Sequence, residues 1–582
     1  MIAPSSSRTY DLVICGGGLA GLGLARQLRL SGNSLSILVL DPIERPLPHA
    51  GFKIGESTVE IGAYYYHHTL QMYDYLESAH LEKLGLRYFF GSTGDFASRP
   101  EYGARRFLPA KSYQIDRGTF ETRLRELVVD DRVDLVEGAR VRDIDIDEQD
   151  DQPHTVHWID ANGIEHQTHA RWVIDAMGRR RYLQSRLGHM KKAPRPRNSV
   201  WWRVKGKVSV NDWVPRSNVE WHQRAEDDRW QSTCHLMGEG YWVWIIPLAP
   251  DNTSIGIVAL DDVHPYHSYG PTPEKAMAWL RTHEPDLARA MDGHDVIDFG
   301  RLKSYSHSST RVISGKRWAC TGVSGVFADP YYSVGTNIIA YSNGFIQRLI
   351  EKDQAGEPLE EYAEYANRYV LTLNDAITEN ISRGMRNLRV GPVTALKTIW
   401  DYYIGWGTSD PQYYHELYLD PALARAISGL VSRVVVTQAR MLALFEAWGQ
   451  HASQRRVQFD YIDYIDDLPT LKAMHLRTLP HRSPTTVREQ LAYMRDAVDR
   501  IEEVAHVIFR MAVRDVHPDE YPRIASAWIN IEAIGLDPSL WESAGLFRPR
   551  SQPREFSAHQ AEFSRLFRWT EEEASALAAA SS

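Results

Sequence analysis

Three glycines near the N-terminus, Gly16, Gly18 and Gly21, constrain the fold more than any other feature of the sequence. They form the spacing G-x-G-x-x-G between the apolar run "YDLVIC" (10–15) and the stretch "LGLARQLRLSGN", whose apolar residues recur with the helical period. The run "LSILVLD" then predicts a second buried strand. Strand, glycine turn, helix and strand make a βαβ unit, so we expect an α/β fold with a Rossmann-like dinucleotide-binding turn.

The glycine turn predicts a pyrophosphate site. The three glycines allow a tight turn, a close approach of the backbone to the phosphates, and close contact between helix and strand. The backbone N–H groups around Leu19 and Ala20 open the helix and are expected to face the phosphates. Asp41 ends the second strand, where a ribose-binding carboxylate stands, although a turn residue before Pro42 is the alternative. The turn alone does not separate FAD from NAD.

Composition narrows the class of protein. The chain has 582 residues, more than one hydrophobic core usually supports, so two or three substructures are expected. A net charge of −9 argues against nucleic acid as a partner. Three cysteines fit a reducing compartment and offer no zinc signature, so no metal is expected. We find neither a signal-peptide pattern nor about 18 consecutive apolar residues, so the sequence predicts a soluble, cytoplasmic protein without a membrane partner.

Two later stretches favour FAD as the dinucleotide. The stretch "YQIDRGTFETRL" (113–124) places Asp116 and Arg117 between a short strand and a helix, where Arg117 can meet phosphate or the flavin edge. The stretch "VIDAMG" (173–178) predicts a buried strand that ends in a turn at Gly178. Both resemble the D-R-x-x-F and D-A-x-G patterns of FAD-dependent monooxygenase-fold proteins. We find no second convincing glycine turn for a nicotinamide, so the reductant is expected as FADH2 from a separate NAD(P)H-dependent flavin reductase.

The periodicity of the sequence changes along the chain and predicts four segments. Residues 1–195 and 306–360 form the first part and the return segment of an FAD-binding domain. Residues 196–305 alternate as strands and predict an inserted, mostly antiparallel sheet on the substrate side. Residues 361–582 predict a helical C-terminal region, with a frayed end. One helix face there contains Met494, Val498, Ile501, Ala505, Ile508 and Ala512.

The stretch "GYWVWIIPLAP" (240–250) places two tryptophans two residues apart. On a strand, Trp242 and Trp244 point to the same face. Pro247 is expected to end that strand or to mark an edge, because it cannot donate to a ladder. From these residues alone, core packing is the plain explanation for the pair.

Together with the earlier motifs, the pattern W-x-W-x-I-P at Trp242, Trp244, Ile246 and Pro247 makes the chain resemble the flavin-dependent halogenases over roughly residues 8–345. Further matches to the family are "IGEST" (54–58), "KLGLRYFF" (83–90) and "GVFADPYYSVGTN" (325–337). The resemblance implies that reduced FAD, oxygen and a halide (chloride or bromide) yield hypohalous acid, which travels to a separate substrate chamber. The paired indoles are then a partition between flavin and substrate.

The resemblance also implies roles for individual residues. Flavin contacts are expected from Ile54, Gly55, Glu56 and Ser57, and from Asp329, Pro330 and Asn337. The backbone N–H groups of Ser333, Val334, Gly335 and Thr336 are expected to hold the halide in a glycine-containing turn. The alternative is that this turn contacts the flavin and holds no halide.

Lys83 is the lysine that the resemblance assigns to halogen delivery. A strand over 83–89 would place Lys83, Gly85 and Arg87 on one face. An ammonium in the substrate chamber can hydrogen-bond hypohalous acid or be converted to a haloamine. Lys53, in "FKIGES", is the rival, but the lysine of the family lies on the later strand.

Two departures from the family pattern bear on the substrate and on FAD. The tryptophan-specific branch has a carboxylate directly before the serine of the turn, where this chain has Tyr332. The expected substrates are therefore phenols, pyrroles or carrier-bound acyl groups rather than free tryptophan. Val323 stands where many of these flavoproteins have an aspartate, which implies that FAD is held more loosely or only in its reduced form.

Three other functions compete with the halogenase. A flavin monooxygenase that hydroxylates an aromatic or polyketide substrate is the main alternative, and the W-x-W-x-I-P motif and Lys83 argue against it. A reductase that saturates isoprenoid chains shares the fold but has no need of the lysine. A non-catalytic flavoprotein that scaffolds a biosynthetic complex would retain the lysine and the halide turn only by coincidence.

Overall fold

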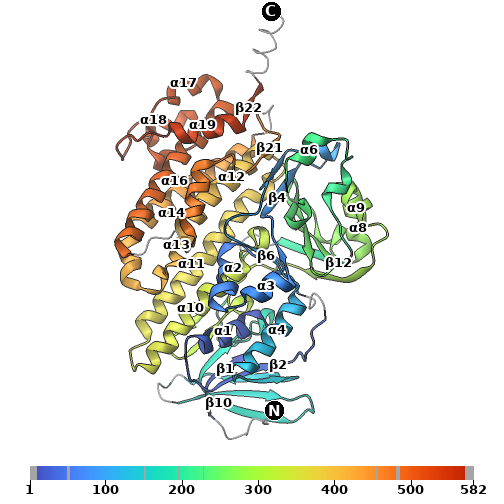
Figure 1. Ribbon diagram of the computed structural model, residues 1–582. Coiled ribbons are helices and arrows are strands. Elements are labelled where there is room, and N and C mark those ends of the chain that lie inside the picture. Colours follow the sequence, from blue (N-terminus) through green and yellow to red (C-terminus); the bar gives the residue numbers. More distant parts are fainter. Residues whose placement is uncertain are drawn as a thin grey trace, which may run out of the picture.

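The computed structural model describes residues 9–48, 53–92, 94–147, 149, 152–193, 197–226, 228–451, 456–479 and 486–570. Two eight-stranded sheets and a helical C-terminal region make up the molecule (Figure 1). In Figure 1 the first sheet lies at the bottom, the second at the right, and the later helices rise along the left side to the top.

The first sheet begins with the expected βαβ unit. Strand β1 (Thr9–Cys15) runs parallel to β2 (Ile37–Asp41), and α1 (Leu19–Leu30) connects them. The sheet order is β18-β19-β10-β1-β2-β7, and β9 and β8 extend it from β10. The remaining strands are β7 (Asp134–Glu137), β8 (Arg140–Asp145), β9 (His154–Ile159), β10 (Glu165–Asp175), β18 (Ile313–Ser314) and β19 (Trp318–Cys320). The predicted strand at 173–178 is the end of β10, and Gly178 follows it with a φ of 60°.

The second sheet has the order β16-β12-β15-β14-β13-β4-β5-β21 and is mostly antiparallel, as expected. Its strands are β4 (Leu86–Phe90), β5 (Glu101–Gly103), β12 (Arg197–Lys205), β13 (Thr233–Gly238), β14 (Tyr241–Leu248), β15 (Asn252–Leu260), β16 (Val296–Leu302) and β21 (Tyr461–Ile462). Strands β4, β5 and β21 come from outside residues 196–305, so the predicted insertion builds only five of the eight strands. The sheet thereby ties the N-terminal, middle and C-terminal parts of the chain together.

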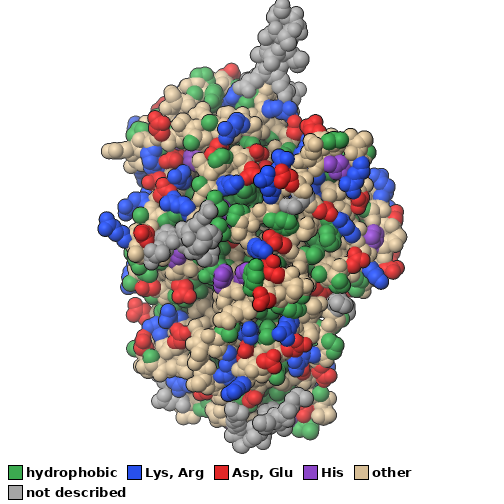
Figure 2. Space-filling model, viewed as in Figure 1, with side chains coloured by type: hydrophobic (Ala, Val, Ile, Leu, Met, Phe, Trp, Pro, Cys, Tyr) green, Lys and Arg blue, Asp and Glu red, His purple; other side chains and the backbone are tan. Residues whose placement is uncertain are grey.

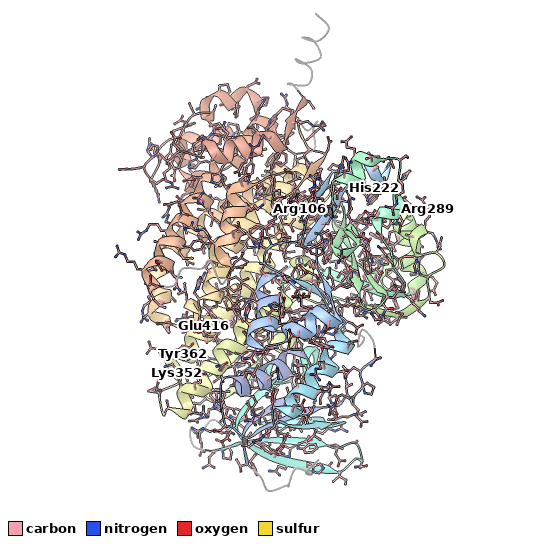
Figure 3. All side chains as sticks on the ribbon, viewed as in Figure 1. Arg106, His222, Arg289, Lys352, Tyr362 and Glu416 are labelled. Atoms are coloured by element: carbon pink, nitrogen blue, oxygen red, sulfur yellow. The ribbon has the colours of Figure 1, made fainter. Side chains whose placement is uncertain are left out.

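Helices cover the first sheet and build the C-terminal region. The helices that matter for the site are α1, α2 (Glu60–Tyr64), α4 (Arg117–Asp130), α10 (Gly335–Gln354), α11 (Glu360–Gly384), α12 (Gly391–Ile404), α13 (Asp410–Tyr414), α14 (Pro421–Gln450), α15 (Pro469–Thr478), α16 (Val487–Val516) and α19 (Ser557–Leu566). Helices α1, α4, α10 and α11 share one apolar core with β1, β2 and β10. At the outer end of α10, Lys352 lies 5.4 Å from the ring of Tyr362 on α11 (Figure 3).

Shorter elements connect these parts. They are α3 (Tyr73–Ala79), α5 (Tyr182–Arg186), α6 (Val219–Gln223), α7 (Tyr266–Tyr269), α8 (Pro273–His283), α9 (Pro285–Met291), α17 (Tyr521–Ile524), α18 (Trp541–Ala544), β3 (Leu81–Glu82), β6 (Tyr113–Gln114), β11 (Met190–Lys192), β17 (His307–Ser309), β20 (Val457–Gln458) and β22 (Arg568–Trp569). Asp116 follows the short strand β6 and caps helix α4, and Arg117 is the first residue of that helix, close to the predicted place between strand and helix.

Helix α16 confirms the helical prediction for the C-terminal region. It begins with a capping box between Thr486 and Glu489, which satisfies two backbone N–H groups at its start. All six residues of its predicted apolar face are buried. Helix α14 packs beside α16 and is the one described helix long and apolar enough to cross a membrane. A single such helix is weak evidence for a membrane span. The predicted frayed end lies outside the described residues from 571 onward.

The predicted strand over 83–89 is wrong in its bounds. Strand β4 begins at Leu86, because Gly85 has a φ of 65° and breaks the extended backbone. Lys83 therefore lies in the connection before the strand, where its N–H donates to the carbonyl of Ser112. Arg87 lies on β4 and is fully buried in an ion pair with Glu101.

Candidate functional site

The glycine turn has the geometry that its spacing predicts. A Cβ on Gly16, whose φ is 115°, would lie 2.3 Å from the carbonyl oxygen of Ala176. A Cβ on Gly21 would lie 2.1 Å from the carbonyl oxygen of Gly16, so both positions require glycine. At Gly18, by contrast, the nearest described heavy atom is Nζ of Lys53 at 3.8 Å. The backbone at the second glycine is therefore open to a phosphate, at the start of α1.

Asp41 shapes this turn from the end of β2. Its carboxylate accepts the N–H of Gly17 at 2.6 Å and a guanidinium N–H of Arg125 at 2.7 Å. Arg125 also donates to the carbonyl of Gly17 at 2.8 Å. The carboxylate therefore lies where a ribose-binding group is expected and at the same time holds the glycine turn in shape. The ribose contact of Asp41 stays a prediction.

The segment 54–58 begins beside the glycine turn. Arg117 donates to the carbonyl of Ile54 at 2.8 Å and pairs with Glu121 on its own helix. Lys53 pairs with the same Glu121. Because Nζ of Lys53 also approaches Gly18, this lysine belongs to the dinucleotide side.

Glu56 links this segment to the second sheet. Its carboxylate pairs with Arg203 at 2.7 Å and accepts the hydroxyl of Ser254 at 2.9 Å. Ser254 in turn accepts the indole N–H of Trp244 at 3.2 Å. The next residue, Ser57, lies 2.8 Å from the hydroxyl of Thr233 on β13. The side chains of Glu56 and Ser57 are thus bonded within the protein, and their predicted flavin contacts stay predictions.

The two tryptophans lie side by side on one face of β14, as predicted. Their ring centroids are 5.7 Å apart, and both indoles are buried. The ring of Trp244 lies on Gly256 of β15, where a Cβ would approach it to 2.2 Å. The ring of Trp242 meets that of Tyr331 edge-on at 5.5 Å. Pro247 lies beyond the last residue pair with β13, so it marks a local edge as expected.

The predicted halide turn leads into helix α10. Ser333 has a φ of 59°, which is rare for a residue other than glycine and bends the chain after Pro330–Tyr332. Helix α10 begins at Gly335, which is exposed, and a Cβ there would meet no described atom within 4 Å. The hydroxyl of Thr336 lies 3.0 Å from that of Tyr66. The N–H of Ser333 donates to the carbonyl of Pro330 at 2.8 Å, so it is not free for the predicted halide. The first N–H groups of a helix lack partners within the helix, so an anion at this turn stays a prediction for the N–H groups of Val334, Gly335 and Thr336.

The residues that flank the turn are held in different ways. Asp329 is buried, accepts the hydroxyl of Tyr305 at 2.5 Å and lies 3.2 Å from Arg197. Its side chain is therefore engaged inside the protein. By contrast, Oδ1 of Asn337 is a buried oxygen without a hydrogen-bond partner in the described structure. Asn337 is thus available to a bound group, whereas Asp329 positions the turn.

Gly322 and Val323 form a turn that packs on the first helix. A Cβ on Gly322, whose φ is 64°, would lie 2.9 Å from the side chain of Ala20. The carbonyl of Val323 lies 3.0 Å from Nε2 of His307. The segment therefore closes against the glycine turn even though it lacks the aspartate of related flavoproteins.

Lys83 lies at the other end of the 54–58 segment. Its Nζ donates to the carbonyl of Thr58 at 2.7 Å, and the residue is 2% exposed. Burial lowers the pKa of Lys83 to about 7, and the charge of Glu60 opposes part of this shift. Burial and the nearby Lys83 also lower the pKa of His235 to about 3, so that imidazole stays neutral.

The helical region adds charged side chains that the sequence did not point to. The hydroxyl of Tyr332 donates to Asp401 at 2.5 Å, and Lys397 pairs with the same carboxylate oxygen at 2.6 Å. Tyr332 and Lys397 line a cavity of about 10 Å³, room for about one water molecule. Helix α12 carries Asp401 next to the turn only through tertiary packing, so no local pattern could have revealed it.

The residues present fit FAD better than a metal. The open backbone at Gly18, the start of α1, Lys53, Arg117 and the free oxygen of Asn337 suit an anionic dinucleotide. Among the described residues, no group of three or more His, Cys, Asp or Glu side chains comes together as metal ligands.

Sequence comparison relates the chain to flavin-dependent halogenases. No family model matches it. It is 28% identical over 360 residues to the flavin-dependent halogenase chlA of Dictyostelium discoideum, covering 57% of this chain and 58% of that protein. It is 26% identical over 379 residues to a 1H-pyrrole-2-carbonyl-(peptidyl-carrier protein) brominase of Pseudoalteromonas luteoviolacea, covering 62% and 83%. The match thus spans less than two thirds of the first relative.

Solved structures show the same fold. A single-residue mutant of halogenase PltM, in complex with FAD, superposes with a TM-score of 0.61 at 15% identity, covering 89% of this chain and 99% of that one. The flavin-dependent brominase Bmp2 gives a TM-score of 0.53 at 21% identity, covering 65% and 87%. The expected α/β fold of FAD-binding halogenases, with its helical C-terminal region, is confirmed.

Proposed function

We propose that this chain, which belongs with the flavin-dependent halogenases in sequence and fold, is an FADH2-dependent halogenase that delivers halogen through Lys83. The observation that carries the proposal is the position of Lys83. The segment 54–58 starts beside Arg117 and the glycine turn and ends at Thr58, whose carbonyl holds the buried ammonium. One continuous segment therefore separates the dinucleotide side from the lysine.

Different residues of the chain bind the halide, separate the substrate from the flavin and deliver the halogen. When bound, FADH2 would supply hypohalous acid from oxygen and a halide. The open N–H groups at Gly335 hold the halide, and the buried pair Trp242 and Trp244 keeps substrate away from the flavin. Lys83 then receives hypohalous acid, either through a hydrogen bond or as a haloamine, and directs the halogen to one carbon.

Tyr332 argues against free tryptophan as the substrate. Its hydroxyl donates to the carboxylate of Asp401, so this position offers a substrate a phenol rather than a free carboxylate. The relatives include pyrrole halogenases that act on a carrier-bound group, so small phenols, pyrroles and carrier-bound acyl groups are the proposed substrates. A separate NAD(P)H-dependent flavin reductase supplies the reduced flavin, and the proposed location is the cytoplasm.

Mass spectrometry of a mixed reaction tests the function. The purified protein is given FAD, a flavin reductase, NADH, oxygen and bromide, with catalase and a panel of phenols, indoles and pyrroles. Products with the bromine isotope doublet support the halogenase. A gain of one oxygen without bromine would instead assign the protein to the hydroxylases.

A further inference from the structure

Arg510 of helix α16 is the one buried arginine in the described part of the chain that has no carboxylate partner. It is 4% exposed. Every other buried arginine forms an ion pair with an aspartate or a glutamate; these are Arg26, Arg87, Arg99, Arg125, Arg197, Arg203 and Arg229. Burial of a charge is costly unless an opposite charge accompanies it. The surroundings of Arg510 therefore lack an anion.

Backbone carbonyls hold the Arg510 guanidinium in place. Its Nε donates to the carbonyl of Ala525 at 3.1 Å, and its terminal nitrogens donate to the carbonyls of His506, at 2.9 Å, and Ala527. A guanidinium has five N–H groups, so two can still donate to a further acceptor. Carbonyls carry no net charge. Burial lowers the pKa of Arg510 to about 10; Tyr521 opposes this shift, and no carboxylate does.

Arg510 lines a pocket in the helical C-terminal region. The pocket, here called the Arg510 pocket, has a volume of about 40 Å³ and lies where α16, α17, α19 and β22 meet (Figure 1). This is room for about three water molecules or a group of similar size. Gln560 and Ser564 of α19 line the pocket and are exposed, so it opens to solvent there. None of the described residues that line it is acidic.

A second arginine faces the same pocket. Arg514 lies one helical turn after Arg510, and its guanidinium is 4.1 Å from the ring of Trp569 and 5.7 Å from that of Tyr521. Like charges four residues apart on a helix repel each other. The next residue, Asp515, accepts the indole N–H of Trp448 at 2.7 Å, so its carboxylate is directed to another part of the core. A bound anion would offset the repulsion between the two guanidinium groups.

The rest of the pocket wall is apolar. The side chains that make it are those of Val507, Met511, Phe563 and Trp569. Inorganic anions gain nothing from such a wall, whereas an organic anion buries its apolar part against it. The combination of two guanidinium groups with an apolar wall therefore favours an organic acid, because Arg–carboxylate pairs are among the stronger hydrogen-bonded contacts in proteins.

We propose that the Arg510 pocket binds a small carboxylate with a short apolar body. The carboxylate accepts hydrogen bonds from Arg510 and Arg514, and the apolar body packs on Phe563 and Trp569. None of these residues is assigned to flavin, halide or halogen delivery. The inference therefore goes beyond the proposed halogenase function and does not depend on it.

Calorimetric titration with butyrate tests the proposal. The full chain is saturated with FAD, and the buffer contains no other carboxylate or phosphate. We expect one saturable site for butyrate and none for butyramide, which has the same shape without the charge. Gln560→Glu places a carboxylate at the exposed rim and should weaken butyrate binding at least tenfold, with an unchanged unfolding midpoint. Gln223→Glu, the same change at an exposed glutamine of α6, should match the wild type.

Arg510→Gln should abolish butyrate binding, and Gln560→Glu decides the question if Arg510→Gln does not fold. Equal affinities of the wild type and Gln560→Glu, or equal binding of butyrate and butyramide, would overturn the site. Tighter binding of inorganic phosphate than of butyrate would overturn the assignment to an organic carboxylate.

The sequence itself offers one competing anion. Glu571, Glu572 and Glu573 follow the last described residue, Thr570, and lie outside the described residues. A variant with glutamine at all three positions separates the two occupants. Butyrate binding of the same strength in this variant and in the wild type supports a separate ligand. Binding that is seen only in the variant would assign the Arg510 pocket to the end of the chain and overturn the proposal.

Discussion

The hydroxyl of Tyr332 donates a 2.5 Å hydrogen bond to Asp401 of α12. The bond joins the turn that opens α10 to the helical C-terminal region. It also shows that a carboxylate does lie near position 332, although it is bonded to the tyrosine and to Lys397 rather than free. The proposed substrate side therefore combines parts of the chain about seventy residues apart, as their numbers in the sequence show.

Tyr332→Phe should remove this bond without changing the volume of the ring. Because the acceptor is a buried carboxylate, we expect the free energy of unfolding to fall by about 1.5–3 kcal/mol. Urea unfolding measures the change. Tyr402→Phe, which makes the same change on α12 beside Asp401, is the comparison variant. Equal free energies of unfolding for the wild type and Tyr332→Phe would contradict a contribution from the bond.

Gly335→Ala should weaken halide binding and leave the fold intact. A Cβ at this position meets no described atom within 4 Å, and alanine favours a helix more than glycine does. The methyl group would enter the predicted halide turn, so the KM for bromide should rise severalfold while the unfolding midpoint stays equal or increases. An unchanged KM would remove Gly335 from the halide site.

If the paired indoles separate the substrate from the flavin, removing one of them should change the products of the reaction. Trp242→Ala should raise hydrogen peroxide release and oxygenated products relative to halogenated ones. Trp202→Ala, which removes an equally buried indole from the opposite core of the same sheet, is the matched control. Both variants should lose about 3–5 kcal/mol of stability, so only a difference in product ratio is informative. The same ratio in both variants would leave the indoles as packing alone.

Lys83 should make stability depend on pH in a defined direction. The pKa of Lys83 is about 7 in the folded protein and 10.5 for an ordinary lysine side chain, so between these values the unfolded chain binds more protons. The unfolding free energy of the wild type should therefore rise from pH 7 to pH 9 relative to Lys83→Met, by up to about 1.4 kcal/mol per pH unit. A constant difference between the two proteins would contradict a depressed pKa.

The sequence was informative where chemistry depends on local spacing. The glycine turn, Arg117 at the start of α4, the paired indoles and the turn at Ser333 were all predicted because each depends on neighbouring residues. Asp401 was not, because only tertiary packing brings α12 next to the turn at Tyr332. The strand at Lys83 was wrong because Gly85 adopts a positive φ that an alternating pattern does not reveal.

Surface charge bears on the proposed partners. On the face shown in Figure 2, acidic and basic side chains are interspersed over both the sheet and the helical parts. This distribution agrees with the net charge of −9 and offers no extended basic area on that face for an acidic carrier protein. A free small molecule and a carrier-bound group are therefore both worth including among the first substrates tested.

Bromination by Lys83→Ala, with Lys53→Ala as control, tests the central claim most directly. Both lysines are close to segment 54–58, but Lys53 lies at the glycine turn and Lys83 at Thr58. At saturating FAD and bromide, we expect Lys83→Ala to bind FAD as the wild type does and to brominate no probe. Lys53→Ala should bind FAD more weakly and still brominate. Undiminished bromination by Lys83→Ala would contradict delivery of the halogen through this lysine.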